Sequence, residues 1–238
     1  MLLLFCKIEH ILYANLQQCC KELIILMELS HLELKILYDE FLDKNIKEEI
    51  KKFVCDLSKD IEIEYNTDKL WEIDFNIGGI GGYCMPANPV QNPFPAGVER
   101  KLYRPLQYAR SEMDMCDVRI FARHVVQNAG LHLEAVCRVF LEERGNDLLL
   151  WNSGTTLGKA IRKIEKLGVF DEKLIEAMLL FVKMYNLSKH EVNQDESKQR
   201  LFNAYDAIVS YFVARVIGVE ILKKVGREEA LGLYKINK

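Results

Sequence analysis

The sequence predicts a mainly α-helical protein, an up-and-down helical bundle with extra N-terminal helices and one small β-hairpin. Three observations lead to this fold class. Apolar residues recur at spacings of three and four over residues 8–58 and again from about residue 106 onward. Residues 61–77 instead alternate apolar and polar side chains, which is typical of strands. Four of the 13 glycines and four of the five prolines lie within residues 78–95, so helix and strand breakers are concentrated there.

These changes of pattern divide the chain into three predicted segments. Residues 1–60 form an N-terminal helical segment, 61–105 a β-hairpin with a Gly/Pro-rich loop, and 106–238 the helical bundle. The hairpin pairs "IEIEY" (61–65) with "LWEIDFNI" (70–77) across "NTDK". The glycines that follow lack the G-x-G-x-x-G register of a dinucleotide loop, which favours a surface loop or linker.

Capping signals set the expected ends of several helices. "SHLE", with Ser30 and Glu33, is a capping box and predicts a helix start. Thr155 or Thr156 caps "LGKAIRKIEKLG", which ends at Gly168, and Asp171 caps the next helix. The last helix contains "AIVSYFVA" (207–214) and is more apolar than the others, so we expect it at the centre of the bundle.

Composition narrows the function classes. A net charge of −3 and a pI near 6.0 argue against a general nucleic-acid coat but leave room for a local basic pocket. The seven cysteines form no C-x-x-C pair, no secretory leader precedes them, and no stretch is apolar enough to span a bilayer, so we expect a cytoplasmic protein. No zinc spacing occurs, and Glu28 and His31 form the only Glu-x-x-His, so neither a metal nor another cofactor is predicted.

Three helical segments follow one another in an order that resembles a known family. "TTLGKAIRKIEKLG" (155–168) precedes "FDEKLIEAMLLFVKMYNLSKHEV" (170–192) and "YDAIVSYFVARVIGVEIL" (205–222). This order resembles the HEPN-type helical domain over roughly residues 107–223, about half of the chain. The resemblance implies a helical bundle that pairs as a homodimer and, in active members, a metal-independent ribonuclease.

The family signature is an arginine, a short spacer and a histidine, often with a polar residue directly after the arginine. His190 matches the histidine and Asn186 the polar residue, so the resemblance makes them the candidate catalytic residues. The arginine position falls on Tyr185 at the commonest spacing and on Lys183 at the longest. Arginine holds a phosphate through a planar fork of donors, lysine supplies charge without that fork, and tyrosine supplies neither. We therefore expect weak or absent cleavage.

The residues themselves support a packing role at Tyr185. Leu174, Met178, Phe181 and Tyr185 form one apolar stripe, which predicts that the tyrosine is buried. The candidate nucleic-acid-binding residues are Lys183, Lys189 and Arg162, which two copies related by a two-fold axis could bring beside His190. Residues 155–200 hold nine Lys/Arg against seven Asp/Glu, an excess too small to predict phosphate binding alone.

"RHVVQNAGLHLE" is a second candidate site. Arg123, Gln127 and Gly130 lie along one side of the predicted helix. His124, Asn128 and His132 follow one another at steps of four and form a polar stripe, which either contributes to the His190 site or faces solvent or a second copy.

Two functions stay open from the sequence. One is a HEPN-like interaction or dimerisation module with lost or weak nuclease activity, in a defence, toxin–antitoxin or stress system. The other is a metal-independent endoribonuclease that uses His190. The tyrosine at the arginine position favours the first. The expected partners are a second copy of the chain, RNA or a partner protein.

Overall fold

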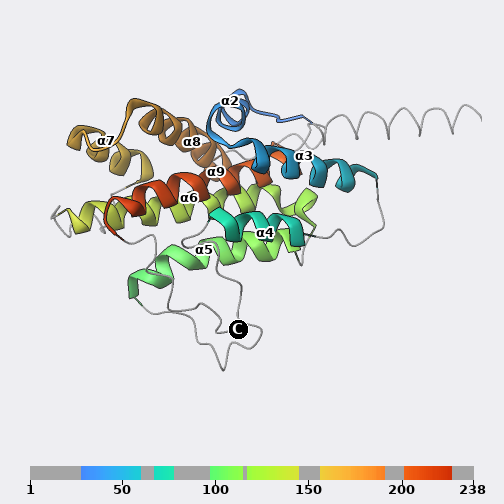
Figure 1. The fold of residues 1–238 in the computed structure, drawn as a ribbon, viewed down its shortest axis with the longest axis horizontal. Coiled ribbons are helices and arrows are strands. Elements are labelled where there is room, and N and C mark those ends of the chain that lie inside the picture. Colours follow the sequence, from blue (N-terminus) through green and yellow to red (C-terminus); the bar gives the residue numbers. More distant parts are fainter. Residues whose placement is uncertain are drawn as a thin grey trace, which may run out of the picture.

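The structure, a computed structural model, describes residues 28–59, 67–77, 97–114, 117–144, 156–190 and 201–226. These residues form a helical bundle without strands, so the mainly α-helical fold class is confirmed for the described part of the chain (Figure 1). Its eight helices are α2 (Leu32–Phe41), α3 (Lys44–Lys59), α4 (Asp68–Ile77), α5 (Gly97–Asp114), α6 (Val118–Glu143), α7 (Leu157–Leu167), α8 (Glu172–His190) and α9 (Ala204–Lys223).

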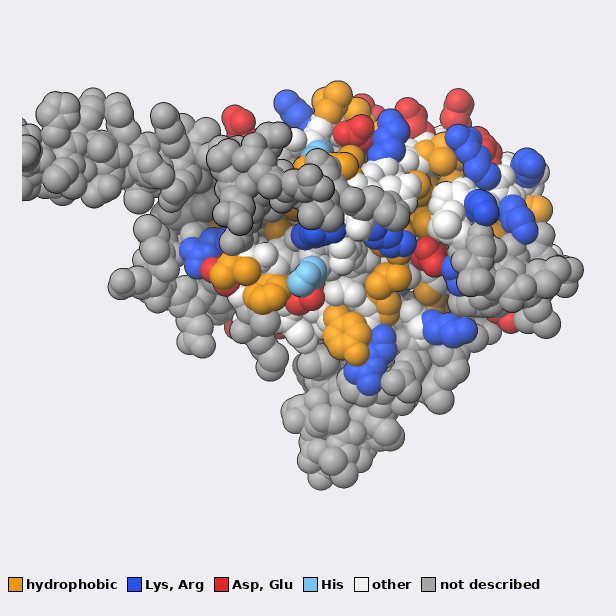
Figure 2. Space-filling view, turned by 180° about the vertical axis from the view of Figure 1, so that it is seen from behind, with side chains coloured by type: hydrophobic (Ala, Val, Ile, Leu, Met, Phe, Trp, Pro, Cys, Tyr) orange, Lys and Arg blue, Asp and Glu red, His pale blue; other side chains and the backbone are white. Residues whose placement is uncertain are grey.

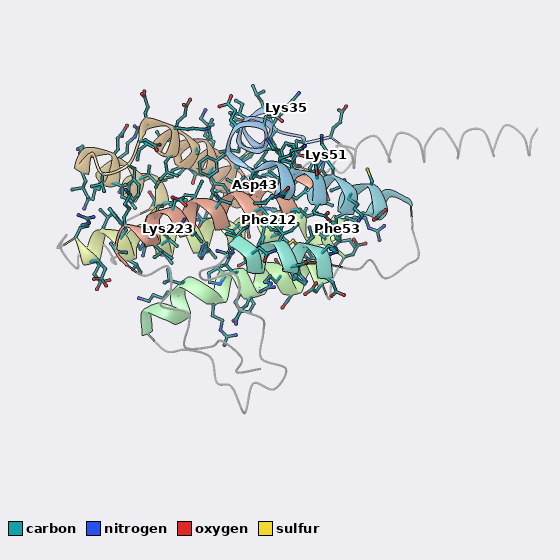
Figure 3. The ribbon with its side chains drawn as sticks, in the orientation of Figure 1. Lys35, Asp43, Lys51, Phe53, Phe212 and Lys223 are labelled. Atoms are coloured by element: carbon teal, nitrogen blue, oxygen red, sulfur yellow. The ribbon has the colours of Figure 1, made fainter. Side chains whose placement is uncertain are left out.

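Helix α9 lies at the centre, as its apolar sequence predicts. Nearly all of its residues are buried, and it packs along α6, which also carries α5 (Figure 1). Phe53 of α3 and Phe212 of α9 both lie in the core, whereas Lys35 is on the outer side of α2 (Figure 3). Gly218 of α9 approaches His132 of α6, and a Cβ atom at Gly218 would lie 2.7 Å from the His132 Nε2 atom. Glycine is therefore required for this close contact between the two helices.

The predicted β-hairpin is wrong in its second strand, because residues 68–77 form helix α4. The stretch "LWEIDFNI" alternates apolar and polar residues, but Leu70, Ile73 and Ile77 also recur at helical spacing. Helix α4 buries Leu70 and Asp74 completely, and Asp74 binds Arg215 of α9. Residues 70–77 fit both the alternation of a strand and the spacing of a helix, and packing against α9 selects the helix. Residues 61–65 lie outside the described residues.

The capping signals are confirmed at α7 and α8 but wrong at α2. Thr156 accepts a hydrogen bond from the Lys159 N–H, and Gly168 ends α7 in the left-handed region at φ 61°. The Asp171 Oδ1 atom accepts from the Leu174 N–H at 2.8 Å. Ser30, in contrast, does not cap α2, whose N-cap is His31.

Ser30 instead joins the beginning of α2 to the beginning of α9. Its N–H donates to the Asp206 Oδ1 atom at 2.9 Å, and its hydroxyl donates to Asp206 Oδ2. Asp206 also forms the capping box of α9 with Asn203, in which each side chain accepts a hydrogen bond from the other's backbone N–H.

The Gly/Pro-rich residues 78–96 lie outside the described residues, and α5 begins directly after them at Gly97. The division into residues 1–60, 61–105 and 106–238 stays a prediction. None of the helices in the described ranges combines the length and the apolar character that a membrane crossing needs.

Candidate nucleic-acid interface

Helix α7 is strongly amphipathic, with a row of cations along one face. Its spacing of i, i+3, i+4 and i+7 places Lys159, Arg162, Lys163 and Lys166 on that face. The other face is buried in the core and carries Leu157, Ala160, Ile161 and Ile164. Burial of this apolar face fixes the helix, so the four cations are held outward.

An open groove of about 670 Å³ lies between α7 and α8. Helix α7 lines it with its four cations, and α8 contributes Leu179, Val182 and Lys183. In Figure 2, Lys and Arg side chains gather on the side of the molecule formed by α7 and α8. The groove therefore combines a half-buried apolar floor with positive charge along its walls.

The first turn of α7 opens into the same groove through Thr156 and Gly158. A Cβ atom at Gly158 would meet only Val182, at the ordinary contact distance of 3.5 Å. The N–H groups of a helix's first turn and the positive end of its dipole favour anions, so the groove has a second source of positive potential.

Two carboxylates pair with cations of the groove. Arg162 contacts Glu165 at 2.8 Å, and Lys183 contacts Glu33 of α2 at 3.9 Å. The Arg162–Glu165 pair is solvent-exposed, and exposed Lys183 lies beside partly buried Glu33. Ion pairs near the surface contribute little, so a phosphate can replace either carboxylate at small cost.

The structure places only two of the three predicted cations in this groove. Arg162 and Lys183 line it, whereas the Lys189 Nζ atom lies 3.7 Å from the centroid of the Tyr185 ring. Partial burial lowers the pKa of Lys189, and Glu134 and Arg138 of α6 are the charges that act on it. Lys189 therefore belongs to the side of α8 that faces α6.

The two candidate catalytic residues follow the groove along α8. Asn186 is exposed and lies one turn after Val182. His190 is the last residue of α8, one further turn along, and its side chain lies outside the described part of the structure. The backbone thus places both on the continuation of the groove wall.

Tyr185, which the resemblance aligns with the arginine of the signature, is buried, as the apolar stripe predicts. Its side chain is 1% exposed and packs against Gly130 of α6. Burial raises the pKa of its hydroxyl, which finds no hydrogen-bond partner among the described residues. The residue at this position is therefore a core residue and cannot reach a phosphate in the groove.

The second candidate site fastens α8 to α6. The side chains of Arg123 and Gln127 both donate to the Ser188 carbonyl oxygen, each at 2.5 Å, and Arg123 also reaches the Lys189 carbonyl at 3.3 Å. The last carbonyls of a helix lack partners within the helix, so these side chains satisfy the end of α8 just before His190.

The predicted polar stripe on α6 falls into three environments. His124 is exposed, with its Nδ1 atom 3.8 Å from Glu112, and Asn128 donates to Glu112 at 3.1 Å. His132 is fully buried, and desolvation lowers its pKa to about 3. Four residues along an α-helix turn by about 40° more than a full circle. His132 lies two such steps after the exposed His124, so its side chain is rotated away from solvent.

Comparison with known protein families, curated proteins and solved structures finds no match to this chain. Within the described ranges, no three His, Cys, Asp or Glu side chains are grouped as a metal site requires. The interpretation of the groove therefore depends on its own geometry and charge.

Sequence reasoning missed three of the cations, Lys159, Lys163 and Lys166. Counting charges over residues 155–200 hides them, because the count also includes carboxylates outside α7, such as Asp171, Glu172 and Glu176. The signal that could have found them is the spacing of Lys/Arg within residues 157–167, which coincides with the helical period.

Proposed function

We propose that this chain is a HEPN-like helical interaction module that binds the phosphate backbone of RNA along the α7–α8 groove and leaves the RNA uncleaved. The observation that carries the proposal is the row of four cations on one face of α7, facing Lys183 of α8. Such a row neutralises successive phosphates of a strand and releases their counterions, which is the main source of sequence-independent affinity.

The composition of the groove favours backbone binding over base recognition. Its described polar lining consists mainly of lysine and arginine, which serve as phosphate contacts, and no aromatic side chain for base stacking is among the described residues that line it. We expect a Kd of about 10⁻⁴ to 10⁻⁶ M at physiological salt, the range typical of sequence-independent binding to the phosphate backbone.

The absence of cleavage in this proposal follows from Tyr185. A ribonuclease of this type needs an acid or base and a cation that stabilises the phosphate charge beside it. The signature's arginine would supply that cation, and here a buried tyrosine occupies its position. Lysines of the groove supply charge for binding without the planar fork that orients a phosphate.

The alternative function is a metal-independent endoribonuclease that uses His190. Its support is the register of α8, in which Asn186 is exposed one turn beyond the groove and His190 follows one turn later. In that case Asn186 orients the imidazole or binds phosphate, and the nearby lysines supply charge.

The binding test uses fluorescence anisotropy of a labelled, mixed-sequence single-stranded RNA. A groove variant, Lys163→Gln/Lys166→Gln/Lys183→Gln, removes three charges, one of which is ion-paired. A control variant, Lys44→Gln/Lys51→Gln/Lys52→Gln, removes three exposed charges from α3, again with one ion-paired. We expect at least tenfold weaker binding for the groove variant and unchanged binding for the control. Equal losses in both would contradict the proposed site.

The same RNA, examined on a denaturing gel after incubation without metal, tests for cleavage. We expect it to stay intact with the wild type and with His190→Ala. Metal-independent cleavage by the wild type that His190→Ala abolishes would establish the alternative function instead.

A homodimer remains part of the proposal, because two copies would present two grooves to one RNA and raise the affinity through avidity. Light scattering on the purified protein measures the oligomeric state directly. If the protein is a monomer, the proposal for the described part of the chain reduces to RNA binding by a single α7–α8 groove.

A further inference from the structure

A carboxylate of α2 reaches one cation of the α7–α8 groove. The Glu33 Oε1 atom lies 3.9 Å from the Lys183 Nζ atom. Glu33 belongs to the first turn of α2, whereas Lys183 lines the groove from α8. Helix α8 contacts both α7 and α2 and lies between them in Figure 1. Lys183 is therefore shared between the groove and a carboxylate on the other neighbour of α8.

The two partners of this ion pair differ in their freedom to move. The Glu33 side chain is 29% exposed, whereas that of Lys183 is 62% exposed. Leu34 and Leu37 are buried and anchor α2 in the core, so the first turn of α2 keeps the Glu33 carboxylate beside α8. Lysine carries its charge on a long, flexible stem. Lys183 is thus the partner that can turn from the carboxylate to a phosphate in the groove.

Contacts between the beginnings of α2 and α9 fix the position of Glu33. Ser30 donates hydrogen bonds to Asp206 from its N–H and from its hydroxyl. The His31 Nε2 atom lies 2.9 Å from the Leu201 carbonyl oxygen. Both contacts come from the residues directly before α2, within one turn of Glu33. The segment that precedes α9 therefore helps to hold the carboxylate opposite Lys183.

The Arg162–Glu165 pair of the groove is of a different kind. Both of its residues lie on α7, one turn apart, so they stay neighbours wherever the helix is. Glu33 and Lys183 belong to different helices, so their ion pair exists only while α2 stays against α8. The Glu33–Lys183 pair therefore couples the charge of the groove to the position of α2.

We propose that Glu33 is a built-in competitor of RNA, whose carboxylate takes the place of a phosphate at Lys183 and lowers the affinity of the groove. This inference rests on the proposed function, because the competition requires that the groove binds phosphate. While α2 is packed on α8, RNA has to displace Glu33 from Lys183. A change that moves α2 away from α8 removes the competitor, so the position of α2 regulates RNA binding.

The test is a double-mutant cycle on the full-length chain, with the labelled mixed-sequence RNA in about 50 mM salt. Fluorescence anisotropy gives the Kd for the wild type, Glu33→Gln, Lys183→Gln and the double variant. We expect Glu33→Gln to bind RNA about two- to fivefold more tightly than the wild type, the size of effect expected for one ion pair near the surface. In the Lys183→Gln background, we expect Glu33→Gln to change nothing, because the contested cation is gone.

The matched control is Glu40→Gln, which removes the same charge from the same helix. Glu40 is exposed and lies about two turns beyond Glu33 along α2. We expect its Kd for RNA to equal that of the wild type. Circular dichroism checks that each variant keeps its helices, because Glu33 also interacts favourably with the dipole in the first turn of α2.

The other outcomes distinguish failure of this inference from failure of the proposed function. If the wild type binds RNA through the groove but Glu33→Gln binds no more tightly, the groove is correct and the competitor is not. An equal gain in the Lys183→Gln background, or with Glu40→Gln, would mean general repulsion between carboxylates and RNA and would overturn the inference. Absence of RNA binding by both the wild type and Glu33→Gln would overturn the proposed function and this inference together.

Discussion

The ring of Tyr185 lies directly against Gly130, so a Cβ atom at Gly130 would overlap ring carbons of the tyrosine. Helix α8 is thereby held close to α6 at the position that the proposed HEPN-like resemblance aligns with an arginine. The contact gives this tyrosine a structural role and explains why its side chain does not line the α7–α8 groove.

Gly130→Ala is expected to destabilise the protein. Alanine favours a helix interior by about 1 kcal/mol over glycine, but forcing the Tyr185 ring out of its place costs more. We expect the free energy of unfolding to fall by about 1–3 kcal/mol, measured by urea denaturation.

Gly158→Ala is the matched control, because the Cβ atom there would make an ordinary 3.5 Å contact with Val182. We expect this variant to be as stable as the wild type or slightly more stable. Equal destabilisation of both variants would mean that the effect comes from the backbone of glycine and not from Tyr185.

Tyr185→Arg introduces the arginine that the proposed HEPN-like resemblance expects here, and it is expected to yield an unstable, inactive protein. The site is 1% exposed, and burying a guanidinium there costs several kcal/mol. Thermal melting and the RNA gel measure the two effects together. A folded variant that cleaves RNA would contradict the structural role assigned to Tyr185.

Asp74 is expected to be essential for stability. Its carboxylate is fully buried and contacts the Arg215 Nε atom at 2.6 Å, accepts from the Tyr211 hydroxyl at 2.9 Å, and lies 3.6 Å from Arg110. Asp74→Asn leaves buried guanidinium charge without its carboxylate, so we expect a loss of about 3–5 kcal/mol.

The control for Asp74 is Glu72→Gln on the same helix. Glu72 is exposed and pairs with Lys69 at 2.6 Å at the surface, so its loss is expected to change stability by less than about 1 kcal/mol. Urea denaturation of both variants distinguishes the loss of the buried Asp74 network from the loss of one negative charge on α4.

His132 is expected to make the protein less stable in acid. Burial lowers its folded pKa to about 3, below the unfolded value of 6.5, so between these pH values the unfolded chain binds a proton that the folded chain does not. The free energy of unfolding therefore falls as the pH falls from 6.5 toward 3, by up to about 1.4 kcal/mol per pH unit.

Comparing wild type with His132→Asn isolates this contribution. Asparagine can still donate to the Leu102 carbonyl, which the His132 Nδ1 atom contacts at 2.9 Å, but it does not titrate. We expect a shallower dependence of unfolding free energy on pH for the variant. Identical slopes would show that His132 is protonated in the folded protein as well.

The sequence was sufficient for features that depend on local signals. Helical periodicity predicted the fold class, Thr156 and Gly168 marked the ends of α7, and the stripe through Tyr185 predicted its burial. The features that failed depend on contacts between distant segments. Ser30 binds Asp206 instead of capping α2, and Asp74 binds Arg215 where alternation had suggested a strand.

The candidate site was predictable only in part for the same reason. A second copy was expected to bring Arg162 beside His190, and Lys183 was identified from its nearness to His190 in the sequence; both line the groove. Lys189 was identified on the same ground, but its position in the turn of α8 points it toward Tyr185. Distance along the chain says little about which face of a helix a residue occupies.

The salt dependence of RNA binding tests the central claim most directly. Each phosphate contact on single-stranded nucleic acid contributes about 0.7 to the slope of log K against log salt concentration. Removing Lys163, Lys166 and Lys183 should therefore make the slope shallower by about 2, while the α3 control keeps the wild-type slope. A groove variant that keeps the wild-type slope and affinity would contradict the assignment of the α7–α8 groove as the phosphate-binding site.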